Sequence, residues 1–399
     1  MPGLRHDRCV VVGDINLVRA LGLAGLRSAV AKPKRFTSAS LSRHCTRRIA
    51  VPDVDVDETG FVRALVDYGR SCHEKPVLFT EGDGDTLAVS RHRNELENYF
   101  HLVLPEASIV EATVDKLAFA ALAEAKGLPV PASRILHPGQ SFADQVLDWK
   151  LFPCILKPTL RNGWFASRLA SGEGRMQKAI RCEDAVKLRA IAASAELHGG
   201  AFVLQESVEG GEEWIESYHA YLRPGGEVVG EFTGKKVRTF SRIHGASTYV
   251  TILDNPEVTK LGRDVLARIG FSGVVKLDFK RDIRDGKLRL LEINPRFSLW
   301  HYPAAVAGVN LPALAFADAM EPGSAKAGRA RAGVSWIYLR EDWKAMREYR
   351  AADELTFRQW IHSVRRADTC HEFAWNDPLP GIFSIGLMVV KGVAGLFKR

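Results

Sequence analysis

Apolar residues in the first hundred positions alternate between short runs and helical spacings. Residues 10–12 form an apolar run, and residues 17–24 repeat apolar side chains at helical intervals. A second helical pattern over residues 61–68 and an apolar run over residues 76–80 continue the alternation. Strands that alternate with helices are typical of parallel β–α–β units. The pattern therefore predicts a doubly wound α/β domain over residues 1–112.

The middle of the chain mixes helices with longer strands. A helical pattern begins after Asp115, which is a good N-cap residue, and a second one covers residues 183–197. Residues 201–253 alternate between apolar and polar positions, as strands with one buried face do. Pro322 and the basic, small residues after it interrupt the apolar periodicity. We therefore place a domain boundary near residue 322.

The last part of the chain, residues 323–399, ends in an apolar segment with two readings. It is a poor membrane span, because Pro380 and Gly381 stand at its start and Lys391 interrupts it. One reading is a core helix of its own domain. The other is an interfacial helix with basic ends that makes peripheral contact with a membrane.

Composition narrows the class of protein. The 399 residues are 46% hydrophobic and 26% charged, which excludes a disordered chain, collagen and a coiled coil. The six cysteines lie far apart and form no Cys-x-x-Cys pair, so we expect reduced thiols in a cytoplasmic protein. The net charge of +8 suits anionic small molecules or a membrane surface, and we expect no nucleic-acid partner.

Candidate chemistry concentrates in two apolar strands around a short Asp-Gly loop. A hairpin symmetric about Asp285 places Asp278 opposite Glu292 on one face. It places Lys276 opposite Asn294 on the same face. Opposed carboxylates repel unless a cation lies between them, and this all-oxygen donor set suits Mg²⁺. The alternative is a solvated face of mixed charge in which Lys276 pairs with Glu292.

Other motifs of the chain favour the Mg²⁺ site over the solvated face. The segment Glu292–Arg296 after its apolar strand resembles the metal-binding strand of the ATP-grasp superfamily. The segments Asp115–Lys116 and Ile155–Pro158 resemble those that hold the two phosphate-contacting lysines of the family. Residues 203–212 resemble the segment that links its two lobes and holds adenosine. Several motifs in the correct order are more specific than any one alone.

The resemblance implies a fold and a domain order. We expect an N-terminal α/β domain over residues 1–112 and a two-lobed ATP-grasp domain over residues 113–322. The hinge between the lobes would lie near residues 200–212, and residues 323–399 would form a small C-terminal extension. One departure from the family lies in Thr159–Phe165, since the loop that covers the phosphates is usually richer in small residues.

The resemblance also implies roles for individual side chains. Those on the nucleotide side are Lys116 and Lys157 for the phosphates, Gln205 and the backbone of Glu206 and Val208 for adenine, and Glu212 for the ribose. Those on the metal and acceptor side are Asp278, Glu292 and Asn294 for Mg²⁺, with Arg296, Lys236, Arg238 and Lys276 for the transferred phosphate, the acceptor and the developing oxyanion.

The function implied is that of an ATP-dependent carboxylate–amine ligase. Two lysines and Mg²⁺, or Mn²⁺ in its place, would neutralise ATP so that a substrate carboxylate can attack it and form an acylphosphate. An amine would then displace phosphate. The alternatives are a kinase of the same superfamily and a catalytically silent membrane-binding or partner-binding module. The complete set of predicted side chains argues against a silent site.

The acceptor pocket is harder to place. Ligands of open α/β folds lie beyond the carboxyl ends of the strands. Gly13 and Asp14 follow the first predicted strand, and Glu81, Gly82 and Asp83 follow the strand over residues 76–80. We therefore expect residues near these two segments to line the acceptor pocket.

Overall fold

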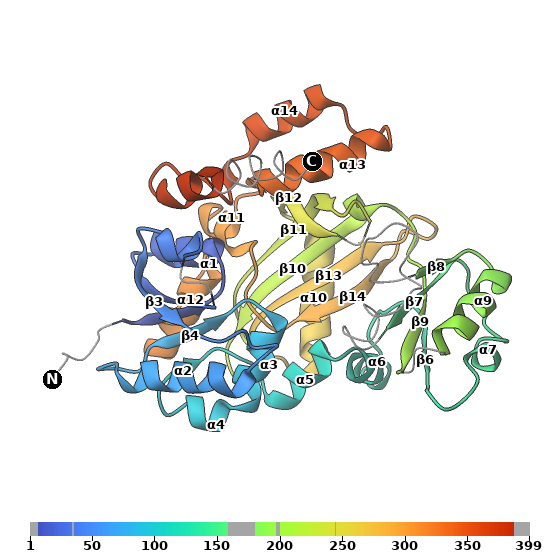
Figure 1. The fold of residues 1–399 in the computed structure, drawn as a ribbon, viewed down its shortest axis with the longest axis horizontal. Helices are drawn as coiled ribbons and strands as arrows, with labels where there is room; N and C mark the ends of the chain where they lie inside the picture. The colour runs from blue at the N-terminus through green and yellow to red at the C-terminus, as the bar shows by residue number, and fades with distance from the viewer. Residues whose placement is uncertain (1–6, 34–35, 159–179, 197–199, 244, 387–399) are drawn as a thin grey trace, which may run out of the picture. The chain divides into compact units, whose positions relative to one another are not determined.

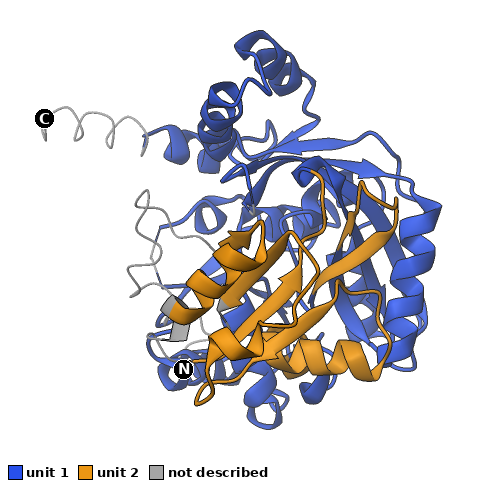
Figure 2. Cartoon of the chain, turned by 90° about the vertical axis from the view of Figure 1, so that its right-hand side faces the viewer, with its two compact units in different colours: residues 1–110, 211–278, 293–399 blue, residues 111–210, 279–292 orange. Residues whose placement is uncertain are grey.

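The computed structural model describes residues 7–33, 36–158, 180–196, 200–243 and 245–386. The phosphate-covering loop predicted at residues 159–165 therefore lies outside the described residues. The chain forms two compact units, shown in Figure 2: unit 1 comprises residues 1–110, 211–278 and 293–399, and unit 2 comprises residues 111–210 and 279–292.

A five-stranded sheet opens unit 1, with the strand order β3-β2-β1-β4-β5 and parallel pairing throughout. Its strands are β1 (Cys9–Val12), β2 (Ser28–Lys32), β3 (Cys45–Ala50), β4 (Val77–Thr80) and β5 (His101–Leu102). The helices that alternate with them are α1 (Ile15–Leu23), α2 (Glu58–Arg70), α3 (Asp83–Arg91) and α4 (Arg93–Leu96), and η1 (Ala39–Leu41) precedes β3 (Figure 1). The predicted doubly wound α/β domain is confirmed.

Strand β1 shows why its sequence is apolar at every position. Cys9 and Val11 belong to one buried cluster, and Val10 and Val12 belong to another. A parallel strand covered on both faces needs apolar side chains in both directions. An unbroken valine run therefore marks a central strand.

The second sheet of the chain has seven strands, in the order β14-β13-β10-β11-β12-β15-β16. They are β10 (Ile215–Leu222), β11 (Val228–Phe240), β12 (Ala246–Leu253), β13 (Gly273–Arg281), β14 (Leu288–Asn294), β15 (Ser335–Ile337) and β16 (Thr369–Cys370). The accompanying helices are η3 (Glu212–Trp214), α10 (Pro256–Ile269), α11 (His301–Val306), α12 (Leu311–Met320), α13 (Leu339–Ala351) and α14 (Phe357–Arg366). Strands from the segment after residue 322 therefore extend the same sheet.

Unit 2 contains a four-stranded antiparallel sheet in the order β6-β9-β7-β8. Its strands are β6 (Ser133–Leu136), β7 (Cys154–Pro158), β8 (Ile180–Cys182) and β9 (Phe202–Glu206). The helices in this part of the chain are α5 (Ala107–Val114), α6 (Lys116–Ala125), α7 (Phe142–Gln145) and α9 (Ala185–Glu196). A buried cluster that includes Phe142, Leu188 and Phe202 forms the core between this sheet and its helices.

The C-terminal segment is helical from residue 379 to residue 386, the last one described. Across the part of the chain that the structure describes, none of the helices combines the length and the apolar character that a membrane span requires.

Candidate active site

Lys157 and Gln205 meet on one face of the unit 2 sheet. Strand pairing sets Gln205 opposite Ile155, and side chains two residues apart along a strand share a face. The Lys157 Nζ donates a hydrogen bond to Gln205 Oε1 at 2.8 Å. The structure therefore joins a residue predicted to contact phosphate with one predicted to hold adenine.

The Lys157 ammonium is also coupled to two further predicted residues of unit 2. Burial lowers its pKa, the charge of Glu292 raises it, and the charge of Lys116 lowers it again, so that the pKa falls from 10.5 to about 8. A buried cation beside a second cation gains stability when an anion binds. Lys116, Lys157, Gln205 and Glu292 therefore form one electrostatic neighbourhood within unit 2.

Lys116 is the first residue of α6, as the sequence predicts. Asp115 caps this helix, since its carboxylate accepts from the N–H groups of Leu117 and Ala118 at 2.9 and 2.8 Å. A lysine in the first helical turn is unfavourable beside the positive end of the helix dipole. A bound anion would remove this penalty.

Backbone hydrogen bonds tether the segment predicted to hold adenine. The Glu206 N–H donates to the Ala132 carbonyl at 2.8 Å, and the Ser207 N–H donates to the Pro153 carbonyl at 2.9 Å. Val208 is buried. These bonds commit the N–H of Glu206, so an adenine contact through its backbone is restricted to its carbonyl.

The loop between β13 and β14 closes differently from the symmetric prediction. The Asp282 N–H donates to the Lys287 carbonyl at 2.9 Å, which centres the turn before Asp285. Gly286 has the left-handed conformation that the Asp-Gly signal predicts, with φ of 70°. Arg284 donates to Asp282 and Glu206, both at distances under 2.8 Å, and these side-chain bonds set the turn.

In unit 1, Asp278 on β13 is the centre of a polar cluster. Its carboxylate is 1% exposed and accepts a hydrogen bond from the Ser217 hydroxyl on β10. The Lys276 Nζ donates to it at 2.6 Å, and the Lys236 Nζ lies 3.6 Å from it. Lys276 also lies 5.7 Å from the ring centre of Trp300. The structure thus brings two predicted cations, Lys236 and Lys276, together at the predicted carboxylate of Asp278.

Asn294 and Arg296 form a second contact in unit 1. The Asn294 Oδ1 accepts from Arg296 Nη2 at 3.1 Å, and the Arg296 Nε donates to Asp83 at the start of α3. The Arg296 Nη1 donates to the Phe297 carbonyl at 3.3 Å. Asp83, expected to line the acceptor pocket, is therefore an ion-pair partner of Arg296.

Arg238 forms a buried ion pair with Asp342. Its guanidinium is 5% exposed, donates to Asp342 of α13 through two nitrogens and stacks 4.6 Å from the Tyr249 ring centre. The pairing of β11 with β12 is irregular between Lys236 and Arg238, which breaks the alternation that the sequence suggests. The two side chains consequently contact different partners, and this environment favours a structural role for Arg238.

Two residues near Asp278 were missed by the sequence interpretation. Ser217 stands opposite Gly234 on the neighbouring strand, and His219 lies two residues further along β10, fully buried and stacked on Phe232 at 4.3 Å. Burial lowers the pKa of His219 well below its usual value. The strand alternation was visible, but a serine and a histidine in such a strand carry no specific signal.

Glu212, the predicted ribose ligand, is buried at the start of η3 in unit 1.

The predicted metal ligands all supply oxygen. Asp278 and Asn294 belong to unit 1 and Glu292 belongs to unit 2. Within the described ranges, no cluster of three or more His, Cys, Asp or Glu side chains has a metal-holding arrangement. Two carboxylates with one amide oxygen fit Mg²⁺, which completes its shell with phosphate oxygens and water.

Comparison with known proteins shows what parts of this chain are similar to. Residues 227–340 match a family model described as "ATP-grasp in the biosynthetic pathway with Ter operon". The fold is similar to an ADP complex of N5-carboxyaminoimidazole ribonucleotide synthetase, with a TM-score of 0.60 and 13% identity, over 84% of this chain and 82% of that one. Residues 227–340 are thus similar to an ATP-grasp family, and the fold is similar to that of the synthetase.

The chain is similar to two further proteins. The biotin carboxylase domain of the Hydrogenobacter thermophilus 2-oxoglutarate carboxylase, solved with MgADP, has a TM-score of 0.59 and 15% identity over 83% of this chain and 74% of its own. D-aspartate ligase of Enterococcus faecium is 25% identical over 272 residues, which are 65% of this chain. The match spans 63% of the length of that ligase.

Proposed function

We propose that this chain is an ATP-grasp ligase that joins a carboxylate to an amine at the expense of ATP. The observation that supports the proposal best is the neighbourhood of Lys157 in unit 2, where a buried ammonium touches Gln205 and is coupled to Lys116 and Glu292. Such a group of cations at a helix start and a strand end suits a triphosphate. D-aspartate ligase, a partial relative, is named for the same class of reaction.

The reaction proceeds in two steps. A carboxylate oxygen of the first substrate attacks the γ-phosphorus of ATP, and the bond from this phosphorus to the oxygen that bridges the β- and γ-phosphates breaks. ADP departs, and an acylphosphate of the substrate remains. The amine nitrogen then attacks the acyl carbon, the bond from this carbon to the phosphate oxygen breaks, phosphate leaves with that oxygen, and the amine loses a proton to solvent. Lys116 and Lys157 offset the triphosphate charge in the first step. Lys236, Lys276 and Arg296 stabilise the oxyanion of the second.

Asp278, Glu292 and Asn294 would hold Mg²⁺, with Mn²⁺ as a substitute of similar preference for oxygen. The ion supplies charge neutralisation and orientation of the phosphate oxygens. Asp278 already contacts Lys276 and Lys236, so those ammonium groups compensate its charge within unit 1. We assign Gln205, the Glu206 carbonyl and Val208 to adenine, and Glu212 to the ribose.

The experiment is ADP release by the purified chain with MgATP and a panel of amino acids, other carboxylates and amines. We expect release only when one carboxylate and one amine are both present, and a mass spectrum that shows an amide. A stable phosphate ester in place of the amide would identify a kinase instead. Absence of ATP binding by the wild type would leave a silent binding module as the better account.

We also propose peripheral contact of this protein with an anionic membrane at the cytoplasmic face. Trp375 is 91% exposed, and Leu379, Ile382 and Ile385 are each 58 or 59% exposed on successive turns of the last described helix. The following sequence contains Lys391, Lys398 and Arg399 and no acidic residue. An apolar helix face with basic neighbours suits an anionic lipid surface.

Sedimentation with vesicles of phosphatidylglycerol and phosphatidylcholine tests this contact. We expect the wild type to sediment with the anionic vesicles and the double variant Ile382→Asp, Ile385→Asp to stay in the supernatant. The exposed Val56→Asp variant, which adds a charge in another exposed loop, is the control. Equal sedimentation of all three proteins would refute the contact.

A further inference from the structure

Two of the six cysteines belong to unit 2, and they stand opposite each other in its sheet. Cys154 begins β7 and Cys182 ends β8, and the antiparallel pairing sets these two residues directly opposite one another. Opposed residues of an antiparallel pair have Cα atoms about 4.5 or 5.5 Å apart, and a disulfide requires about 4.4 to 6.8 Å. The pairing of β7 with β8 therefore provides the backbone spacing of a disulfide.

Both thiols lie in the core of unit 2, since directly opposed side chains share one face of a sheet. Cys154 and Cys182 are fully buried, and both belong to the apolar cluster that contains Leu156 and Leu188. A side-chain hydrogen bond between the two thiols raises the pKa of Cys154 and lowers that of Cys182. Cys182 is therefore the thiol of the pair that ionises first.

The opposite face of the same strands contains part of the candidate nucleotide site. Side chains alternate along β7, so Cys154 and Leu156 face the core and Lys157 faces the other way. On that other face the Lys157 ammonium donates to Gln205 at 2.8 Å. A bond between the two thiols would thus form behind the predicted phosphate contact without occupying it.

The neighbours of both cysteines hold the segment predicted to bind adenine. The Pro153 carbonyl, next to Cys154, accepts the Ser207 N–H at 2.9 Å. Arg181, next to Cys182, donates through Nη1 to Ser207 Oγ at 2.9 Å and to Glu209 Oε1 at 2.8 Å. One set of contacts comes from β7 and the other from β8. Ser207 is therefore held from both strands only while β8 stays paired with β7.

Strand β8 is the least secured strand of the sheet. It has three residues and lies at the edge, where it pairs with β7 on one side. Short elements at an edge open locally at a lower free energy than central strands do. Opening of β8 would bring the buried Cys182 thiol into contact with solvent. The thiol pair thus combines the spacing of a disulfide with a route by which a reagent reaches it.

We propose that Cys154 and Cys182 form an intramolecular disulfide when the chain meets a small-molecule disulfide, and that this bond fixes β8 and Arg181 against residues 207–209. Formation of the bond does not depend on the proposed function, whereas its effect on nucleotide binding rests on that function. A disulfide that keeps a binding segment in place lowers the cost of ordering it when the ligand binds.

The reaction consists of two thiol–disulfide exchanges. The Cys182 thiol loses its proton, and its sulfur attacks one sulfur of the small disulfide. The sulfur–sulfur bond breaks, and one small thiol leaves after it takes up a proton. The Cys154 thiol then loses its proton and attacks the Cys182 sulfur, which releases the second small thiol. The protein loses two electrons and two protons, and the small disulfide gains them as two thiols.

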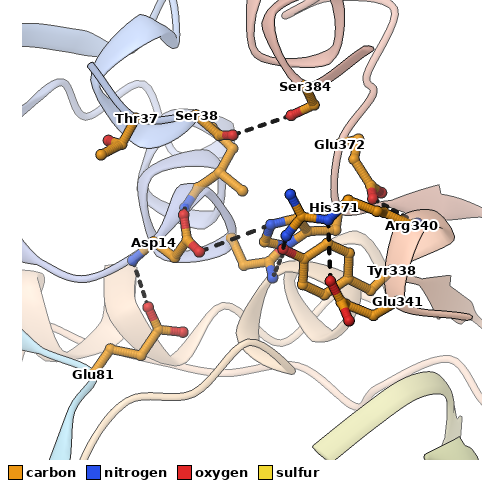
Figure 3. Close-up of polar contacts among 12 residues, drawn as sticks. Asp14, Thr37, Ser38, Glu81, Tyr338, Arg340, Glu341, His371, Glu372 and Ser384 are labelled. Atoms are coloured by element: carbon orange, nitrogen blue, oxygen red, sulfur yellow. Dashed lines mark hydrogen bonds and ion pairs between the residues drawn. The ribbon is translucent and has the colours of Figure 1, made fainter. Parts of the chain in front are cut away.

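Cys370 of unit 1 is a suitable control, because its thiol has a carboxylate as its partner. It donates to Glu372 Oε2 at 3.3 Å. Figure 3 shows Glu372 beside Arg340, whose backbone N–H donates to Oε1 of the same carboxylate at 2.8 Å. Burial, and then the charge of Glu372, raises the pKa of Cys370 to about 11. A thiol in this state is a poor nucleophile at neutral pH.

The bond is tested on the full chain with oxidised glutathione as the small disulfide. After incubation, the protein is denatured, its remaining thiols are alkylated with iodoacetamide, and its proteolytic peptides are identified by mass spectrometry. We expect the peptides of Cys154 and Cys182 to be joined and the other four cysteines to be alkylated, in the wild type and in Cys370→Ala alike. Cys154→Ala should stop after the first exchange, with glutathione on Cys182.

The effect of the bond is measured by calorimetric titration of the reduced and the oxidised protein with MgATP. We expect the Kd of the oxidised wild type to be about 3- to 10-fold lower, because residues 207–209 are already ordered. Arg181→Met should form the disulfide and show the same Kd in both states. The midpoint of thermal unfolding of the wild type should rise on oxidation, because the bond restricts the unfolded chain.

The proposals fail in different ways. Alkylation of all six cysteines, or glutathione on Cys182 of the wild type with no link to Cys154, would overturn the disulfide and leave the ligase intact. A disulfide with equal Kd values in both states would overturn its effect on residues 207–209. A disulfide in a wild type that binds no MgATP in either state would overturn the ATP-dependent function and keep the modification site.

Discussion

Lys157 is a cation whose charge varies with pH near neutrality. Its pKa of about 8 results from burial and from Lys116, which together outweigh the opposing charge of Glu292. Bound triphosphate stabilises the protonated form, so the pKa of Lys157 rises in the complex. Below about pH 8 the ammonium is present before ATP binds, and above it the ammonium must be formed during binding.

We therefore expect Lys157 to take up more than half a proton when MgATP binds at pH 8.5. The affinity for MgATP should fall as the pH rises above 8. Calorimetry in two buffers with different ionisation enthalpies measures the uptake. Lys157→Arg keeps a positive charge at every pH in this range and is the control. Equal proton uptake by the wild type and by Lys157→Arg would contradict the assignment.

Several residues of the candidate site could be predicted from the sequence, and others could not, for physical reasons. Lys116 and Lys157 could be predicted because a cap residue and a strand end mark them locally. The contact of Ser217 with Asp278 joins residues 61 positions apart, and no local pattern encodes it. The role of Arg238 depends on Asp342, which lies 104 residues away on a helix that the sequence did not resolve.

Helix α13 is attached to the seven-stranded sheet through a buried ion pair. Asp342 on α13 is fully buried and accepts from Arg238 of β11, from the Thr248 hydroxyl of β12 and from the Trp360 indole of α14. Three donor side chains on separate elements compensate one carboxylate. Removing one partner of such a pair leaves an uncompensated buried charge.

Arg238→Met should accordingly lower the free energy of unfolding by about 3 kcal/mol. Arg329→Met is the control, since Arg329 pairs with Asp254 at the surface and its loss should cost less than about 1 kcal/mol. Urea unfolding followed by tryptophan fluorescence measures both changes. A cost for Arg238→Met as small as that of the control would show that this ion pair does not anchor α13.

Two of the strands that sequence analysis could not predict are very short. Strands β15 and β16 have three and two residues, which is too few to show an alternating pattern. They nevertheless join the residues after 322 to the seven-stranded sheet, because β15 pairs with β12 and β16 pairs with β15. The longer strands β13 and β14, in contrast, were visible in the periodicity of the sequence, whereas the 13-residue helix α13 was not.

At the scale of the whole molecule, buried neutral histidines make the fold sensitive to acid. His301 is fully buried, and its Nδ1 accepts from the Ser298 N–H at 3.0 Å. Burial lowers its pKa from 6.5 to about 3. The unfolded chain binds a proton at this position below pH 6.5 while the folded chain does not, so stability is complete above 6.5 and is lost as the pH falls toward 3.

Between pH 7.5 and pH 5.0 this single site should reduce the free energy of unfolding by about 2 kcal/mol. His301→Asn, which retains an acceptor for the Ser298 N–H, should lose that much less over the same interval. Urea unfolding at the two pH values measures the difference, with exposed His137→Asn as the control. Identical pH dependence of wild type and His301→Asn would refute the assignment.

The central claim is that a substrate carboxylate is activated as an acylphosphate. Its most direct test uses the carboxylate substrate found in the ADP-release assay, labelled with ¹⁸O in the carboxylate group, together with the amine and MgATP. Transfer through an acylphosphate moves one ¹⁸O into inorganic phosphate, which ³¹P NMR detects as an isotope shift. We predict one ¹⁸O per phosphate released. Unlabelled phosphate formed together with the amide would contradict the account.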